Sequence, residues 1–477
     1  MNEVIVYGGA LAVLAVIAVS LMRVAQGAIH YAPSLGWACI MALPFLFEFS
    51  LIHPDTRMLQ GGIILWVMAL IFALDTFADR HIKDMPADST VCSLRLAYMM
   101  AAGYLGITVF HLATVNSIPL ISVFTDNLTN FGEDPAMRAL VDEGRLQFSR
   151  NYTFMPFLKY VFTLSTPLLG VPAALLLWSQ KRRATAALLF CWIISYCVLS
   201  TAKGPFILAL IMILISVLHF SKNPQRQNMG RFFVVIGCIG LMGLVGMTSG
   251  HPNKGSVLSN LKAKFETPHP LREGRTFMLG DYVRSQRDTT VTQSTCIKLY
   301  PCRKANYIVY RIFLTPVEVS ARWYEYFTTF PVTDVSYSRL INDSRSGERK
   351  HPAQAVAQWA FAEPFPHEYS NIAFAYPSMD ADAYGRYGLM GLLIVAFMYS
   401  VMRVGSILFH DLRAPTRGVY YTVMTGLLTM LPANASIQAM VLAHGVAPIL
   451  MVMFAIFACT HYDAIVAAYR SLRAKAA

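Results

Sequence analysis

The apolar positions of this chain fall into runs of membrane length, separated by short polar segments and by two long ones. The runs lie at about 4–22, 35–52, 59–78, 93–114, 154–178, 185–201, 205–220, 231–249, 386–409, 418–440 and 444–468. A helix of roughly 20 mostly apolar residues spans the hydrocarbon core of a bilayer. The pattern therefore predicts an all-α polytopic membrane protein with about eleven transmembrane helices.

The two long polar segments divide the chain into three parts. We expect a transmembrane bundle at 1–249 with a loop at 115–153, a large loop at 250–385, and C-terminal transmembrane helices at 386–477. The 250–385 segment lacks the alternating apolar and polar pattern of β-strands. Loops with short helices are the prediction for it.

The short polar segments indicate how the chain is oriented. Lysines and arginines gather in 179–184, in 221–231, in 410–417 and in the C-terminal tail. Short loops rich in these residues stay in the cytoplasm, whereas long loops are exempt from the rule. This orientation puts the N-terminus outside, the C-terminus inside, and both long segments in the periplasm or cell exterior.

Composition agrees with a membrane protein and argues against nucleic-acid binding. The chain is 55% hydrophobic and 14% charged, and its net charge is +12. Because the basic residues lie mostly between apolar runs, topology and contact with anionic lipid explain the charge better than a nucleic acid does. The first run has neither a basic segment before it nor a small-residue cleavage site after it, so we expect a retained span rather than a signal peptide.

Two of the eight cysteines stand apart from the others. Six lie in or beside apolar runs and are expected to be small buried hydrophobes, but Cys296 and Cys302 lie in the polar stretch TQSTCIKLYPCRK. If that stretch is periplasmic, a local disulfide between them is expected. A zinc site needs two more ligands at matching spacing, and we find none in the sequence.

Several ionisable residues occur inside apolar runs or at their ends. Glu48 and Lys159 are central in their runs, so each is expected to face the bundle interior. His111 and Arg403 lie nearer to run ends, where no special partner is expected. Lys203, in the turn STAKGP, either extends its amine to the interface or faces a phosphate-bearing lipid.

The stretch LTPVEVSARWYEYFTTFP predicts a helix that begins at Thr315. TPVE is a capping box with proline at the first helical position. Glu318, Arg322 and Glu325 then share one face, and pairing of Glu318 with Arg322 is the simplest expectation. Arg311 precedes this helix among apolar and aromatic residues, where it needs an anionic partner. A protein carboxylate and a phosphate fit equally well.

Polar residues concentrate where the large loop leads into the next apolar run, in PHEYSNIAFAYPSMDADAYGRYGLMG at 366–391. His367 follows Pro364 and Pro366 and precedes Glu368, so its backbone is restricted, and its ordinary pKa suits a base near neutrality. Glu368, Asp380 and Asp382 could ligate a divalent cation through oxygen, but they lack a regular ligand spacing. Three glycines at intervals of three suit a tightly packed helix start: Gly385, Gly388 and Gly391.

This late loop closes in His-Glu-x-x-Asn and then Asp-x-Tyr-Gly-x-x-Gly-Leu-x-Gly before a span. In these features the chain resembles the Wzy-type O-antigen polymerases and the related O-antigen ligases. The residues that carry the resemblance are His367, Glu368, Asn371, Asp382, Tyr384, Gly385, Gly388, Leu389 and Gly391. Ligases usually pair the histidine with asparagine where this chain has Glu368, so the identity of the base, His367 or Glu368, stays open.

The resemblance implies a GT-C-like glycosyltransferase of the bacterial inner membrane that joins undecaprenyl-diphosphate-linked oligosaccharides into O-antigen. It implies His367 or Glu368 as the base, with Asp382 orienting a cation. Lys203, Arg311 and Arg322 would bind the diphosphate without a metal or other cofactor.

The resemblance also implies partners, and rival functions can be stated beside it. Membrane lipids and lipid-linked oligosaccharides are the expected partners, and a chain-length regulator protein is a further candidate. The nearest rival is a ligase that transfers finished glycan to a lipid core. A different class is a transporter or flippase, although the sequence shows no internal repeat of the kind common in transporters.

Overall fold

The computed structural model describes residues 2–48, 54–82, 94–115, 118, 158–199, 203–220, 315–331, 340–343, 346–362, 377–410, 415–460, 462 and 466–467. Across these ranges the regular structure is helical except for one short hairpin, in which β1 (Ile341–Asn342) pairs antiparallel with β2 (Arg349–Lys350). The prediction of an all-α membrane protein is confirmed at this level.

The helices follow the apolar runs closely. In the first half they are α1 (Asn2–Ala25), η1 (Ile29–Tyr31), α2 (Ala32–Trp37), η2 (Ala38–Ala42), α3 (Leu43–Glu48), α4 (Pro54–His81), α5 (Leu94–Thr114), α8 (Leu158–Ser165), η5 (Thr166–Gly170), α9 (Val171–Ser179), α10 (Arg183–Leu199) and α11 (Lys203–Phe220). In the second half they are α17 (Thr315–Thr329), α18 (Pro352–Ala357), η8 (Gln358–Ala362), α19 (Met379–Tyr387), α20 (Met390–Leu408), α21 (Pro415–Asn434), η9 (Ala439–Ala443) and α22 (Val446–Thr460).

Six helical stretches among the described residues are long and apolar enough to cross a membrane. They are Gly8–Ala25, Ile29–Leu46, Thr56–His81, Leu94–Thr114, Val161–Ser179 and Met390–Leu408. Shorter apolar helices occupy Arg183–Leu199, Ile207–Ser216 and Val446–Cys459. The predicted run at 231–249 lies outside the described residues, so the count of eleven spans stays a prediction.

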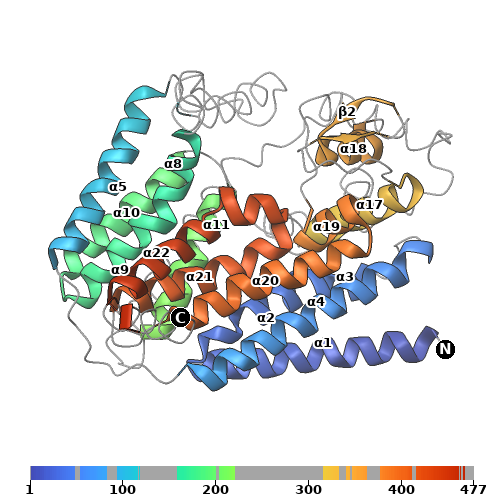
Figure 1. The fold of residues 1–477 in the computed structure, drawn as a ribbon, viewed down its shortest axis with the longest axis horizontal. Helices are drawn as coiled ribbons and strands as arrows, with labels where there is room; N and C mark the ends of the chain where they lie inside the picture. Colours follow the sequence, from blue (N-terminus) through green and yellow to red (C-terminus); the bar gives the residue numbers. More distant parts are fainter. Residues whose placement is uncertain are drawn as a thin grey trace, which may run out of the picture.

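The helix α21 is central to the packing of the bundle. It contacts α2, α9, α11 and α22, while α5, α8 and α10 lie together to its left in Figure 1. A Cβ on Gly36 of α2 would lie 2.1 Å from the carbonyl oxygen of Thr429, and a Cβ on Gly426 would lie 2.8 Å from Cα of Met212. Glycine at these two positions lets helix backbones approach closely, as is common between membrane helices.

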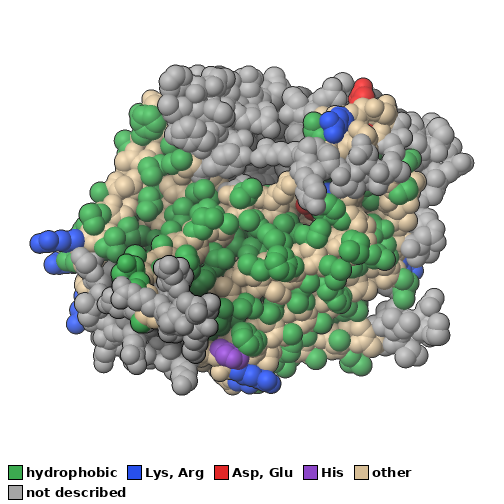
Figure 2. Space-filling model, viewed as in Figure 1, with side chains coloured by type: hydrophobic (Ala, Val, Ile, Leu, Met, Phe, Trp, Pro, Cys, Tyr) green, Lys and Arg blue, Asp and Glu red, His purple; other side chains and the backbone are tan. Residues whose placement is uncertain are grey.

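The surface of the bundle is apolar over a broad area. Figure 2 shows hydrophobic side chains covering the middle of the visible face, with lysines and arginines nearer its edges. On α20, Leu393 is 59% exposed and Phe397 is 67% exposed. An apolar surface of this extent is unsuited to water and is the expected surface toward lipid.

Short polar elements gather at one end of the bundle, at the upper right in Figure 1. Here α17 packs against α19, α4, α18 and the η2 turn, and the small hairpin lies close to α18. Of these elements, α17, α18 and the hairpin lie in the 250–385 segment and α19 begins in it, and the sequence predicts short helices there. Within the described part of that segment, short helices predominate as expected.

Local sequence explains where these short helices begin. α17 begins at Thr315 with Pro316 next, as the capping box predicts. α18 has Pro352 at its first position, and Nδ1 of His351 accepts a hydrogen bond from the backbone N–H of Ala353 at 3.2 Å. The first backbone N–H groups of a helix have no partner within it. Each proline removes one such donor, and His351 supplies an acceptor for another.

Candidate functional site

The helix α19 carries the acidic part of the sequence motif. Asp380 and Asp382 lie in its first turn and Arg386 in its last, which matches the charges to the helix dipole. Nε of Arg386 donates to Oδ1 of Asp382 at 2.9 Å, and both side chains are buried. The Asp382 carboxylate, expected to orient a cation, therefore binds the guanidinium one turn along its own helix.

Neutral hydroxyl groups join α19 to α17. The hydroxyl of Tyr324 donates to Oδ2 of Asp380 at 2.7 Å, and the hydroxyl oxygens of Ser320 and Ser378 lie 2.8 Å apart. The rings of Tyr324 and Tyr384 pack with centroids 5.0 Å apart. We call this α17–α19 contact, made by Ser320, Tyr324, Ser378, Asp380 and Tyr384, the junction.

Burial governs the electrostatics of the junction. Desolvation raises the pKa of Asp380, and hydrogen bonds from Ser378 and Tyr324 oppose that rise. Desolvation also raises the pKa of Asp382, against the attraction of Arg386. The pKa of Tyr324 lies well above its ordinary value because of burial and the nearby Asp380 carboxyl, so its hydroxyl keeps its proton and remains a donor.

The charged face of α17 contains a buried ion pair one turn along the helix. Nη1 of Arg322 donates to Oε2 of Glu325 at 2.9 Å, three residues along the helix, and both side chains are buried. The side chain of Glu318, the partner expected from the sequence, lies outside the described residues. On the opposite face, Trp323 and Phe327 are buried, as their pattern predicts.

The three glycines of the motif have separate structural reasons. A Cβ on Gly385 would lie 2.6 Å from the Phe327 ring, and one on Gly391 would lie 2.2 Å from the carbonyl oxygen of Ala383. Gly388 ends α19 with φ of +58°, a conformation that favours glycine. The predicted run that starts at 386 is therefore divided at Gly388, and α20 begins at Met390.

Two of the predicted site residues are described in full, and they lie on helices that pack together. Arg322 is on α17 and Asp382 is on α19, but each side chain is paired within its own helix. Lys203 is the first residue of α11, and its side chain lies outside the described residues. The remaining predicted residues also lie outside them: His367, Glu368, Arg311, Cys296 and Cys302.

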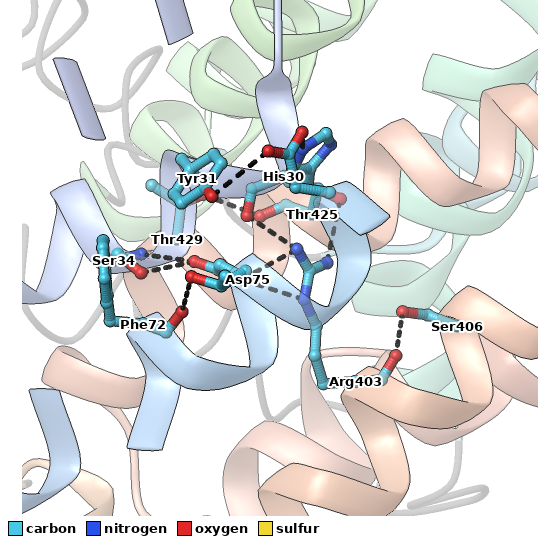
Figure 3. Close-up of polar contacts among 11 residues, drawn as sticks. His30, Tyr31, Ser34, Phe72, Asp75, Arg403, Ser406, Thr425 and Thr429 are labelled. Carbon is cyan, nitrogen blue, oxygen red and sulfur yellow. Dashed lines mark hydrogen bonds and ion pairs between the residues drawn. The ribbon is translucent and has the colours of Figure 1, made fainter. Parts of the chain in front are cut away.

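A second set of charges, inside the bundle, was not predicted from the sequence. Arg403 of α20 and Asp75 of α4 are both fully buried, and Nη2 of Arg403 lies 2.8 Å from Oδ1 of Asp75. The backbone N–H of Ser34 donates to Oδ2 of Asp75 at 3.0 Å, and Nη2 of Arg403 donates to the carbonyl of His30 at 2.7 Å. Figure 3 shows these groups converging from α2, α4, η1 and α20.

Polar contacts extend from this cluster toward the surface. Nε2 of His30 lies 2.8 Å from Oδ1 of Asp79, whose side chain is 28% exposed. Nη1 of Arg23 lies 3.8 Å from Oδ2 of Asp79, and the Arg23 side chain is 45% exposed. Exposure therefore decreases from the Arg23–Asp79 pair, at the ends of α1 and α4, to the fully buried Asp75–Arg403 pair in the interior.

The expectation that Arg403 and His111 need no special partner is wrong. Nδ1 of His111 lies 2.5 Å from the hydroxyl of Tyr196, and its ring stacks on Phe162 with centroids 4.1 Å apart. Arg403 is paired with Asp75.

The sequence contained a signal for the pairing of Asp75 with Arg403. Asp75 lies in the apolar run 59–78 and Arg403 in the run 386–409, and opposite charges in two runs are expected to pair. The side chains of Glu48 and Lys159 lie outside the described residues.

Neither the chemistry of the described side chains nor comparison with known proteins identifies a cofactor. No group of three or more His, Cys, Asp or Glu side chains that could hold a metal ion occurs among the residues that the structure describes. No protein-family model, no curated protein and no solved structure matches this chain.

Proposed function

We propose that this protein is a glycosyltransferase of the bacterial inner membrane that polymerises undecaprenyl-diphosphate-linked oligosaccharide repeat units. Supporting the proposal are the motif that ends at Gly391, the apolar helices, and the packing of α17 against α19 at one end of the bundle. The last of these carries most weight, because it brings Arg322 and Asp382, far apart in sequence, onto two helices in contact.

The reaction needs a base and a cationic site, and the chain has residues suited to both. The acceptor sugar hydroxyl loses its proton to His367 or Glu368, and its oxygen forms a bond to the anomeric carbon of the donor. The bond from that carbon to the diphosphate oxygen breaks, and the undecaprenyl diphosphate leaves with the electron pair. Arg311, Lys203 and Arg322 would stabilise the leaving charge.

The rigid part of this proposed site is the junction. Its buried hydrogen bonds fix α19 on α17, and the Gly388 turn directs the chain into α20. Since Arg322 is already paired with Glu325, we infer that it contributes fixed positive charge from a partly neutralised pair. Asp382 likewise holds Arg386 in place rather than acting on substrate directly.

A transporter of lipid-linked oligosaccharide is the second candidate, and the bundle interior gives a specific reason to test it. Ionisable residues buried between membrane helices often mark ion or substrate paths, and Asp75 and Arg403 are such residues. The cluster leads to the partly exposed Asp79. A ligase shares the proposed chemistry and differs only in its acceptor.

One assay separates the three functions. Purified protein in detergent receives a lipid-diphosphate oligosaccharide with and without an added core lipid, and the products are separated on a gel. A ladder of repeat lengths supports the polymerase. Transfer only to the core lipid supports the ligase, and the absence of any covalent product leaves the transporter.

Variants then test the residues. Arg311→Ala and His367→Ala should each abolish the ladder while the protein still inserts into the membrane. Arg349→Ala, in the exposed end of the hairpin, is the matched control and should give the normal ladder. Normal product lengths from the first two variants would remove these residues from the site.

A further inference from the structure

Arg403 and Asp75 fix one membrane helix against another. Nε and Nη2 of Arg403 lie 3.0 and 2.8 Å from the same Asp75 oxygen, and Nη2 also donates to the His30 carbonyl. Asp75 in turn accepts from the backbone N–H of Ser34 at 3.0 Å. A single guanidinium therefore holds α20 against α4 and against the chain that enters α2 (Figure 3). We call Asp75 and Arg403 the register pair.

Apolar side chains alone define the register of a membrane helix weakly. Lipid tails are as apolar as the helix faces, so no hydrophobic force favours one helix–helix register over another. The buried face of α20 before Arg403 includes Val395 and Tyr399, and the Tyr399 hydroxyl has no hydrogen-bond partner among the described residues. A buried charge that leaves its partner is costly, so a polar pair specifies the register.

Both helices of the register pair lead to the junction. At 1.5 Å per residue, Arg403 lies about 18 Å along α20 from Gly391, where α19 is joined by a tight turn. Asp75 lies about 22 Å along α4 from Gln60, whose amide nitrogen lies 3.5 Å from the carbonyl oxygen of Val317 in α17. One helix of the pair thus holds α19, and the other contacts α17.

A register slip at one end would separate the helices at the other. A slip of one helical turn moves a helix by about 5.4 Å along its axis. The Tyr324–Asp380 hydrogen bond, at 2.7 Å, and the Ser320–Ser378 contact, at 2.8 Å, do not survive such a movement.

We propose that Asp75 and Arg403 are positioning residues, which set the register of α20 against α4 and so keep α19 seated on α17. The inference concerns the arrangement of the helices and does not rest on the proposed function. Its test is therefore a measurement of the junction itself, made in membranes on the full chain.

A pair of introduced cysteines reports on the junction directly. In a background with the eight native cysteines replaced, Ser320→Cys and Ser378→Cys put two thiols where the hydroxyl oxygens are 2.8 Å apart. Under mild oxidation the two should form a disulfide, because hydroxyl oxygens 2.8 Å apart mark positions from which two sulfurs can reach their bonding distance of about 2.05 Å. A maleimide polymer labels only free thiols, so the loss of labelling over time measures the rate at which the disulfide forms.

The decisive variant removes both charges. Asp75→Leu with Arg403→Met leaves no unpaired buried charge, and such replacements usually preserve folding. We expect normal insertion but a disulfide rate about tenfold lower, since hydrogen bonds to charged groups contribute a factor of this order to an equilibrium between registers. A rate equal to the reference would overturn the proposal, because apolar packing alone would then set the register.

Two further variants separate register from general loosening. Leu176→Ala creates a cavity in α9, away from α4 and α20, and should lower the melting temperature without changing the disulfide rate. An equal slowing in this variant would contradict the proposal. Arg403→Lys keeps the charge but has no fork of donors to hold Asp75 and the His30 carbonyl together, so the rate should fall severalfold. If the double variant fails to insert, an unchanged rate in Arg403→Lys still overturns the inference.

Discussion

The bundle cluster, which is the Asp75–Arg403 register pair and its partners, and the junction both bury arginines beside carboxylates. They connect helices in different ways. In the bundle, the Arg403–Asp75 ion pair joins residues 328 positions apart on different helices. In the junction, the Arg322–Glu325 and Asp382–Arg386 pairs each lie within one helix. There, the described contacts between helices include hydrogen bonds from neutral hydroxyls.

Because of this difference, separating the helices costs more free energy in the bundle than at the junction. Pulling α20 from α4 leaves two charges unpaired inside the membrane, which costs roughly 3–5 kcal/mol for a broken buried pair. Moving α17 from α19 breaks hydrogen bonds of roughly 0.5–1.5 kcal/mol each and leaves each ion pair intact. The Asp75–Arg403 pair is therefore the costlier contact to break, and the junction, held by individually weaker contacts, depends on that pair to stay aligned.

The largest expected effect comes from Arg403→Met. It leaves the Asp75 carboxylate buried without its cation and should lower the free energy of unfolding by about 3–5 kcal/mol. Chemical unfolding in detergent measures the change, with Arg182→Met in the exposed turn after α9 as control. A loss no greater than that of the control would mean that the ion pair does not hold the bundle together.

The next effect tests the junction backbone. A Cβ on Gly391 would lie 2.2 Å from a carbonyl oxygen that cannot move aside, so Gly391→Ala should cost about 1–3 kcal/mol. Gly62→Ala is the matched control, because nothing lies within 4 Å of its Cβ and alanine favours the helix. The free energy of unfolding of the two variants should change in opposite directions. A stabilised Gly391→Ala would show that α19 and α20 are not closely packed.

A third prediction depends on pH. Burial raises the pKa of Asp380 in the folded protein, so the folded state holds this proton to higher pH than the unfolded chain does. The resulting stabilisation is complete below the unfolded pKa of about 4 and is lost as pH rises through the folded pKa. Asp380→Asn lacks this contribution, and its free energy of unfolding should fall less than that of the native chain over this range. If the free energies of unfolding of the native chain and of Asp380→Asn changed in parallel with pH, the raised pKa of Asp380 would be contradicted.

The smallest expected effect is the loss of one neutral hydrogen bond. Ser320→Ala removes the hydroxyl that meets Ser378 and accepts from its backbone N–H at 3.3 Å. A loss of about 1 kcal/mol is expected from unfolding measurements. Thr328→Ala on the same helix serves as the comparison: it removes an exposed hydroxyl 3.3 Å from that of Tyr384, and because water can replace this contact, stability should change less.

Much of the fold was predictable from the sequence because lipid imposes strict conditions. Apolar runs of membrane length have one stable regular structure, the helix, and the helices that are described follow those runs. The start of α17 was also predictable, since a capping box and an N1 proline act locally. Division of the run at 386 was less visible, because it depends on the positive φ of Gly388 in the folded chain.

The site was predictable only in part, because pairing is a property of the folded chain. The spacing of Glu318, Arg322 and Glu325 allowed two pairs on one helix, and the structure shows Arg322 with Glu325. The Arg403–Asp75 pair needed the relative depth of two distant helices, which periodicity does not contain. Proximity of Arg403 to a run end was a misleading guide, since burial depends on neighbours as well as on position.

The most direct test of the proposed glycosyl transfer is the release of its leaving group. Purified native protein receives oligosaccharide linked to a radiolabelled lipid diphosphate, and free lipid diphosphate and new glycosidic bonds are counted together. Transfer between lipid-linked chains predicts one lipid diphosphate released for every bond formed, with none released from His367→Ala. Substrate that stays intact, even where it crosses between the leaflets of a vesicle, would contradict glycosyl transfer and support transport.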